Sequence, residues 1–63
     1  MYTQRQESIL KHLSDVKVAR VDQMAEIFGV SIESIRRDLI VLETDGAIQR
    51  TRGGAVFGKL RAK

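Results

Sequence analysis

Two adjacent arginines, Arg36 and Arg37, stand among isoleucines and leucines in the segment SIESIRRDLIVLE of this 63-residue chain. A guanidinium group presents a planar fork of donors that can bind guanine O6 and N7 bidentately or pair with a phosphate. Ser31, Glu33 and Ser34 precede them, and serine hydroxyls can contact either base edges or phosphates. These residue types indicate nucleic-acid recognition if the segment is a helix and the side chains face outward.

The same segment has the apolar periodicity of a helix. One buried face is predicted by residues at i, i+3, i+7 and i+10, namely Ile32, Ile35, Leu39 and Leu42. At about 100° per residue, Arg37 lies nearly opposite Ile35 and Arg36 lies on its flank. Ser31 is placed to cap this helix, and residues 44–46 are expected to end it at a glycine.

Charged residues on a helix also have a simpler explanation. Glu33 and Arg37 are four residues apart and could form only an intrahelical ion pair on a solvated surface. The architecture predicted around these residues favours nucleic-acid recognition over a simple surface ion pair, because a second basic element follows the helix.

That second element is a predicted hairpin. Strand-like residues 47–50 and 55–57 flank a turn in which Gly53 and Gly54 allow positive φ and a close approach to phosphate. Residues 1–49 carry six basic and eight acidic side chains, whereas residues 50–63 carry five basic and none acidic. The candidate DNA contacts in the hairpin are Arg50, Thr51, Arg52, Gly53 and Gly54.

The earlier part of the chain predicts two further helices. Thr3 and Gln6 form a capping box that starts the first helix, which is expected to break at residues 14–15. A short extended piece is expected between residues 16 and 21, followed by a helix at Val21–Phe28 that ends at a glycine. A very tight turn then leads to Ser31, so the second and third helices are expected to cross steeply. The predicted class is mainly α with a small two-stranded hairpin.

Other function classes find little support. The chain has no cysteine and a single histidine, His12, so we expect no disulfide and no metal site. No catalytic Cys–His or Ser–His–acid set and no phosphate-cradling G-x-x-x-x-G-K-[ST] loop is present, so we expect no enzyme activity and no cofactor in this domain. No stretch approaches the roughly 18 apolar residues of a membrane span, and a cytoplasmic location is expected.

Residues 28–55, FGVSIESIRRDLIVLETDGAIQRTRGGA, resemble the signature of the DeoR family of bacterial transcription repressors. That signature has the form VS-x-x-T-I-R-R-D-L-x-x-L-E followed by R-x-H-G-G-A, and a weaker resemblance extends back to the first helix. It implies a winged helix-turn-helix domain at residues 1–57, with the third helix as the recognition helix and residues 48–57 as the wing. It also implies sequence-specific binding of double-stranded DNA.

Family members carry a second, larger domain that binds a phosphorylated sugar or related metabolite. The resemblance therefore implies an operator-binding domain of a repressor of carbohydrate or related metabolic genes, homo-oligomeric at full length. Residues 58–63 would be a basic tail that begins the linker to that effector domain. A winged module that binds protein or structured RNA through the same scaffold is the alternative.

Three positions depart from the family pattern. Arg52 replaces a histidine, which makes the charge of the donor independent of pH. Ser34 replaces a threonine, so a hydroxyl is kept but a methyl that could touch thymine is lost. Arg20 stands where relatives often place a serine or threonine cap for the second helix.

Four other residues carry separate expectations. Asp38 is expected to pair with a nearby arginine and hold the third helix in place. His12 is expected to cap a helix end or to face solvent. Ile40 and Val41 point away from the Ile35 face, so they either pack under the wing or form a small surface for a partner subunit.

Overall fold

The chain folds into three helices and one small sheet, as the computed structural model of residues 1–58 describes it. The elements follow the order α1 (Gln4–Val16), β1 (Val18–Arg20), α2 (Val21–Phe28), α3 (Ile32–Thr44), β2 (Ile48–Thr51) and β3 (Gly54–Phe57). The predicted class, mainly α with a small β-hairpin, is confirmed. The basic tail predicted at residues 58–63 lies outside the described residues from position 59 onward.

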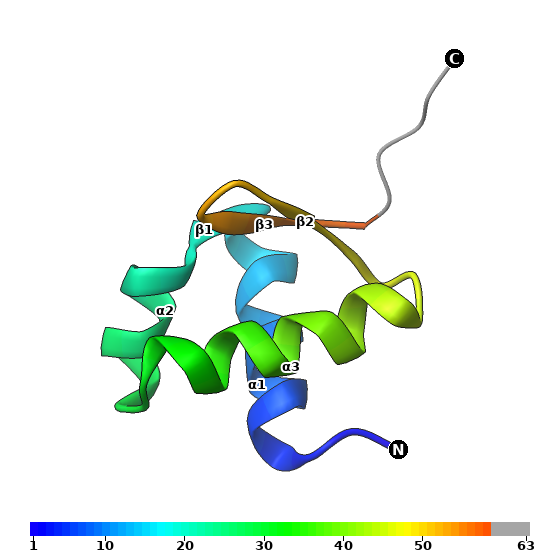
Figure 1. Cartoon of the computed structure of the whole chain (residues 1–63). Coiled ribbons are helices and arrows are strands. Elements are labelled where there is room, and N and C mark those ends of the chain that lie inside the picture. The colour runs from blue at the N-terminus through cyan, green and yellow to red at the C-terminus, as the bar shows by residue number, and fades with distance from the viewer. Residues whose placement is uncertain (59–63) are drawn as a thin grey trace.

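In Figure 1, α3 crosses in front of α1, α2 lies beside the N-terminal end of α3, and the sheet lies above α3 at the C-terminal end of α1. Apolar side chains on one face of each helix, together with Ile48 of β2, form the core. The largest fully buried side chains are Ile9, Leu13, Met24, Ile35, Leu39, Leu42 and Ile48. Because three of these residues come from α3, the core holds one face of that helix and leaves the other face exposed.

The sheet has three strands in the order β1-β3-β2, and both pairs are antiparallel. The hairpin of β2 and β3 is the predicted wing, whereas β1 is the short extended piece, which joins the wing through β3. Ala19 lies opposite Ala55, and Arg20 lies opposite Gly54. This pairing satisfies backbone groups of β1 that a lone three-residue strand would leave open.

Gly54 is buried where β1 and β3 meet. A Cβ at this position would overlap the carbonyl oxygen of Ala19. The strands therefore approach closely only because residue 54 has no side chain.

The helix ends follow local chemistry. The capping box of α1 is present, with Thr3 Oγ1 accepting from the Gln6 N–H and Gln6 Oε1 accepting from the Thr3 N–H. The predicted break at residues 14–15 is wrong, because α1 continues to Val16. It ends where Lys17 adopts φ 72° and donates its N–H to the Leu13 carbonyl. Gly29 ends α2 in the predicted left-handed conformation, at φ 68°.

Candidate nucleic-acid interface

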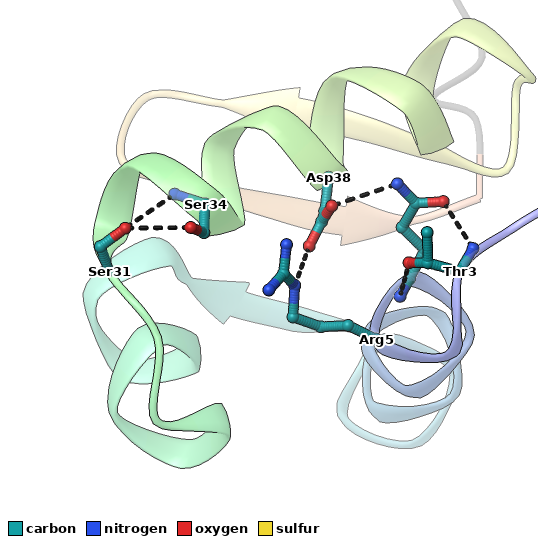
Figure 2. Close-up of polar contacts among 6 residues, drawn as sticks. Thr3, Arg5, Ser31, Ser34 and Asp38 are labelled. Carbon is teal, nitrogen blue, oxygen red and sulfur yellow. Dashed lines mark hydrogen bonds and ion pairs between the residues drawn. The ribbon is translucent and has the colours of Figure 1, made fainter.

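Asp38 anchors α3 to the beginning of α1. Its buried carboxylate accepts a hydrogen bond from Arg5 Nε on one oxygen and from Gln6 Nε2, at 3.1 Å, on the other. Figure 2 shows Arg5 reaching Asp38 of α3 from the first turn of α1. The carboxylate raises the pKa of Arg5 above its ordinary value, because hydrogen bonding favours the charged guanidinium. The predicted pairing of Asp38 with an arginine is confirmed.

A serine pair organises the N-terminus of α3. Ser31 Oγ accepts from the Ser34 N–H at 3.1 Å and donates to Ser34 Oγ at 3.0 Å, as Figure 2 shows. The Ser34 hydroxyl can still donate outward. This end of the helix also offers free backbone N–H groups and a partial positive charge, both of which suit a phosphate.

The exposed side of α3 carries charge along its length. Arg37 is 78% exposed, and its Nε lies 3.9 Å from a carboxylate oxygen of Glu33, which is itself 68% exposed. Such a long and solvated ion pair contributes little to stability. Both side chains are therefore available to a partner.

Arg36 lies on a different side of the helix, toward the wing. It lines an open groove of about 690 Å³ between α3, the wing and the junction of β1 with α2. The remaining polar side chains around this groove are Arg20, Asp22, Arg50, Thr51 and Arg52. Four arginines thus converge on one concave surface with a single carboxylate among them. This combination is the electrostatic footprint of a nucleic-acid partner.

Arg50 joins the wing to α3. Glu43 near the end of α3 accepts from the Arg50 backbone N–H at 3.1 Å and from Arg50 Nε at 2.8 Å. These hydrogen bonds lower the pKa of Glu43 below its ordinary value, because they favour the carboxylate. The Arg50 side chain remains 45% exposed, so its other guanidinium edge can reach a ligand.

The tip of the wing is tied to α2. The Gly53 carbonyl accepts from the Val21 N–H at 2.9 Å, and Gly53 itself has φ 78°. Thr51, Arg52 and Gly53 are exposed at this tip, whereas Gly54 is buried against β1. The reason for glycine at position 54 is therefore packing, and its contact with DNA stays a prediction.

Arg20 stands where relatives often place a serine or threonine cap, and this changes how α2 begins. Arg20 is the N-cap residue but makes no side-chain capping hydrogen bond. Its guanidinium pairs with Asp22 at 3.1 Å on the surface. The Gly53 carbonyl of the wing instead accepts a hydrogen bond from the Val21 N–H, which satisfies one of the free backbone donors at the start of α2.

Two sequence expectations need revision. His12 is half-buried and packs edge-to-face on Phe28, with ring centroids 6.0 Å apart, so it neither caps α1 nor simply faces solvent. Ile40 and Val41 are 46% and 41% exposed, so neither is packed away under the wing. No sequence pattern predicted that Arg20 or Glu43 would lie near the wing, because Arg20 meets it through the pairing of β1 with β3 and Glu43 through its contact with Arg50 of β2.

The fold and the groove define a winged helix-turn-helix DNA-binding domain, in which α2 and α3 form the helix-turn-helix and β2–β3 the wing. Residues 5–60 match the family described as the DeoR-like helix-turn-helix domain. The chain belongs to this family.

Curated relatives support the same assignment. The chain is 40% identical over 57 residues to the L-fucose operon activator of Haemophilus influenzae, covering 90% of this chain and 23% of that protein. It is 37% identical over 60 residues to the HTH-type transcriptional repressor GlcR of Bacillus subtilis, covering 95% and 23% respectively. A putative aga operon transcriptional repressor of Escherichia coli O157:H7 is 35% identical over 55 residues, covering 87% and 20%.

The chain spans less than a quarter of the length of these relatives. No solved structure gave a significant match. Within residues 1–58, no helix is long and apolar enough to cross a membrane.

Proposed function

We propose that this chain is the operator-binding domain of a transcriptional repressor, with α3 in the major groove of DNA and the wing on the flanking backbone. The observation that carries the proposal is the shared groove that Arg36 on α3 lines together with Arg50, Thr51 and Arg52 of the wing. A duplex seated against α3 would meet both basic elements at once. Winged helix-turn-helix domains use this arrangement to read bases with the helix and to position the backbone with other contacts.

The predicted site residues divide into two groups by their place in the fold. Glu33, Arg36 and Arg37 are exposed on α3. The two arginines are proposed to reach base edges or adjacent phosphates, and the Glu33 carboxylate is proposed to accept from a base amino group. Ser31 and Ser34 are proposed to bind phosphate at the helix N-terminus. The proposed backbone contacts of the wing are Arg50, Thr51, Arg52, Gly53 and Gly54.

The whole protein is proposed to control genes of carbohydrate or related metabolism. The names of the Haemophilus and Escherichia relatives, which refer to the L-fucose operon and the aga operon, support a role in the control of metabolic genes. Two of the three relatives described above are named repressors, which supports repression. By family resemblance, a second domain would bind a phosphorylated sugar, and the full-length protein would be a cytoplasmic homo-oligomer without enzyme activity. Two copies would then occupy two half-sites, which raises affinity above that of one domain.

An NMR titration tests the DNA-binding surface without a known operator. The chain is titrated at low salt with a mixed-sequence DNA duplex, and backbone amide shifts are followed. We expect the shifts to cluster at residues 31–37 and 50–54. A double variant, Arg36→Ala with Arg52→Ala, should lose most of them while keeping a folded spectrum.

An RNA duplex of the same sequence serves as the control for the alternative function. A-form RNA has a deep, narrow major groove that α3 cannot enter, so weaker and more scattered shifts are expected. Equal or larger shifts with RNA would favour the RNA-binding alternative. If neither duplex moves the α3 and wing amides, the DNA-binding proposal fails and a protein partner becomes the leading candidate.

A further inference from the structure

Ile40 is an apolar side chain on the charged side of α3. It is 46% exposed, whereas the core-facing residues Ile35 and Leu39 are at most 1% exposed. At about 100° per residue, Ile40 projects between the directions of Arg36 and Arg37, one turn further along the helix. An exposed isoleucine therefore continues the surface that presents the two guanidinium groups.

The exposed residues Glu33, Arg36, Arg37 and Ile40 fall at i, i+3, i+4 and i+7. Homeodomain recognition helices read bases in the major groove with four side chains at this same spacing. This spacing lets residues from three successive turns face one groove. Ile40 is the member of the set that can neither donate nor accept a hydrogen bond.

The major groove offers an apolar group that such a side chain can recognise. Thymine carries a 5-methyl group there, and it is the apolar mark that distinguishes its base pair. An isoleucine in van der Waals contact with this methyl removes apolar surface of both groups from water. Ser34 lacks the methyl of the threonine common in the family, so an apolar contact from Ile40 would come from a different turn of α3.

We infer that Ile40 is a specificity-determining residue that contacts the 5-methyl group of a thymine beside the bases met by Arg36 and Arg37. The inference rests on the proposed function. It makes the recognised sequence dependent on a thymine at one position of the half-site, next to the arginine contacts.

Val41 provides a matched control on the same helix. It is also β-branched, is 41% exposed, and follows Ile40 directly. Its direction is rotated by about 100° from that of Ile40, toward the side of the helix that carries Asp38. Truncation of Val41 removes a similar apolar side chain without touching the proposed thymine contact.

The experiment begins with selection of preferred duplexes from a random library by the chain. Each thymine of the selected site is then replaced singly by uracil, which removes the 5-methyl group and keeps the Watson–Crick pair. Dissociation constants are measured for the unmodified chain, Ile40→Ala and Val41→Ala. Amide spectra of both variants establish that they are folded.

We expect one uracil replacement to weaken binding of the unmodified chain about fourfold, the affinity equivalent of one buried methyl group. Ile40→Ala should bind the thymine and uracil duplexes equally, while Val41→Ala should keep the fourfold difference. A selected site in which no thymine shows this dependence on Ile40 would overturn the inference and leave DNA binding intact. Selection that enriches no sequence would contradict the proposed function itself.

Discussion

The Glu43 carboxylate accepts two hydrogen bonds from Arg50, one from its backbone N–H at 3.1 Å and one from its Nε at 2.8 Å. The first joins α3 to the backbone of β2, and the second orients the guanidinium at the rim of the groove. The position of the wing is thereby coupled to the helix beside it. A substitution of Glu43 is expected to act on the wing through Arg50, although Glu43 itself is not proposed to touch DNA.

Glu43→Gln tests this coupling through pH. The pKa of Glu43 is lowered in the folded chain, so the pair contributes stability above the ordinary carboxyl value near 4.5 and loses it as pH falls through the lower, folded value. We expect the unmodified chain to be more stable than Glu43→Gln at neutral pH, with the difference disappearing in acid. Urea unfolding at a series of pH values measures it. A difference that persists unchanged below pH 3 would show that the ion pair is not its cause.

Asp38→Ala should destabilise the domain by about 1.5–3 kcal/mol, because it removes charge-assisted hydrogen bonds made in a buried position. Asp15→Ala, at an exposed acidic position on α1, should change stability by no more than about 0.5 kcal/mol. Both values come from urea unfolding at neutral pH. Equal effects of the two substitutions would contradict an anchoring role for Asp38.

Gly54→Ala should weaken the junction of β1 with β3. The added Cβ would overlap the Ala19 carbonyl, and relief of such overpacking typically costs about 1–3 kcal/mol. Gly53→Asn is the matched change at the neighbouring glycine, where a Cβ meets nothing and asparagine tolerates positive φ. Thermal unfolding should show a clear loss for Gly54→Ala and a small one for Gly53→Asn. The reverse order would mean that the tip of the wing, rather than the strand junction, limits stability.

Arg52→Ala should reduce the dependence of DNA affinity on salt. If Arg52 neutralises one phosphate, the slope of log K against log salt should fall in magnitude by about 0.9 on B-form DNA. Arg50→Ala should reduce it by less, because Glu43 already offsets part of the Arg50 charge. Fluorescence anisotropy between 50 and 200 mM salt gives both slopes. An unchanged slope for Arg52→Ala would remove this residue from the interface.

Arg37→Ala should cost about 1–3 kcal/mol on the preferred site and relax the preference at one base position, if Arg37 reads a guanine. Lys11→Ala, which removes an exposed charge of α1 outside the groove, is the control and should change binding little. Competition binding against duplexes with single base changes measures both. A uniform loss on all sequences would identify Arg37 as a phosphate contact.

Several parts of this domain could be predicted from local sequence patterns. Apolar spacing within one helix correctly predicted that Ile35, Leu39 and Leu42 are buried, but it was wrong for Ile32, which is 48% exposed. The capping box at Thr3 and Gln6 predicted the start of α1. The RRDL and GGA segments carried the family resemblance that the comparison with known proteins confirmed. Each of these signals depends on residues within a few positions of one another, so each can be recognised from the sequence.

The partners of individual side chains required the tertiary structure. Asp38 was expected to meet an arginine, but Arg5 is 33 positions away and reaches it only because α1 packs against α3. The exposure of Ile40 likewise depended on where the sheet covers α3 and where it does not. Helical periodicity gives the direction in which each side chain projects from the helix axis. The packing of other elements determines which of these side chains are buried.

The three helices, the hairpin and the family could be predicted from the sequence, because local periodicity, end-capping and motif spacing involve neighbouring residues. The fold was needed to show that β1 pairs with β3, that Gly54 is required at their junction, and that Arg36 lines one groove with the wing residues. These relationships join segments that are distant along the chain. Their geometry follows from long-range strand pairing and helix packing, for which a single sequence carries no local signal.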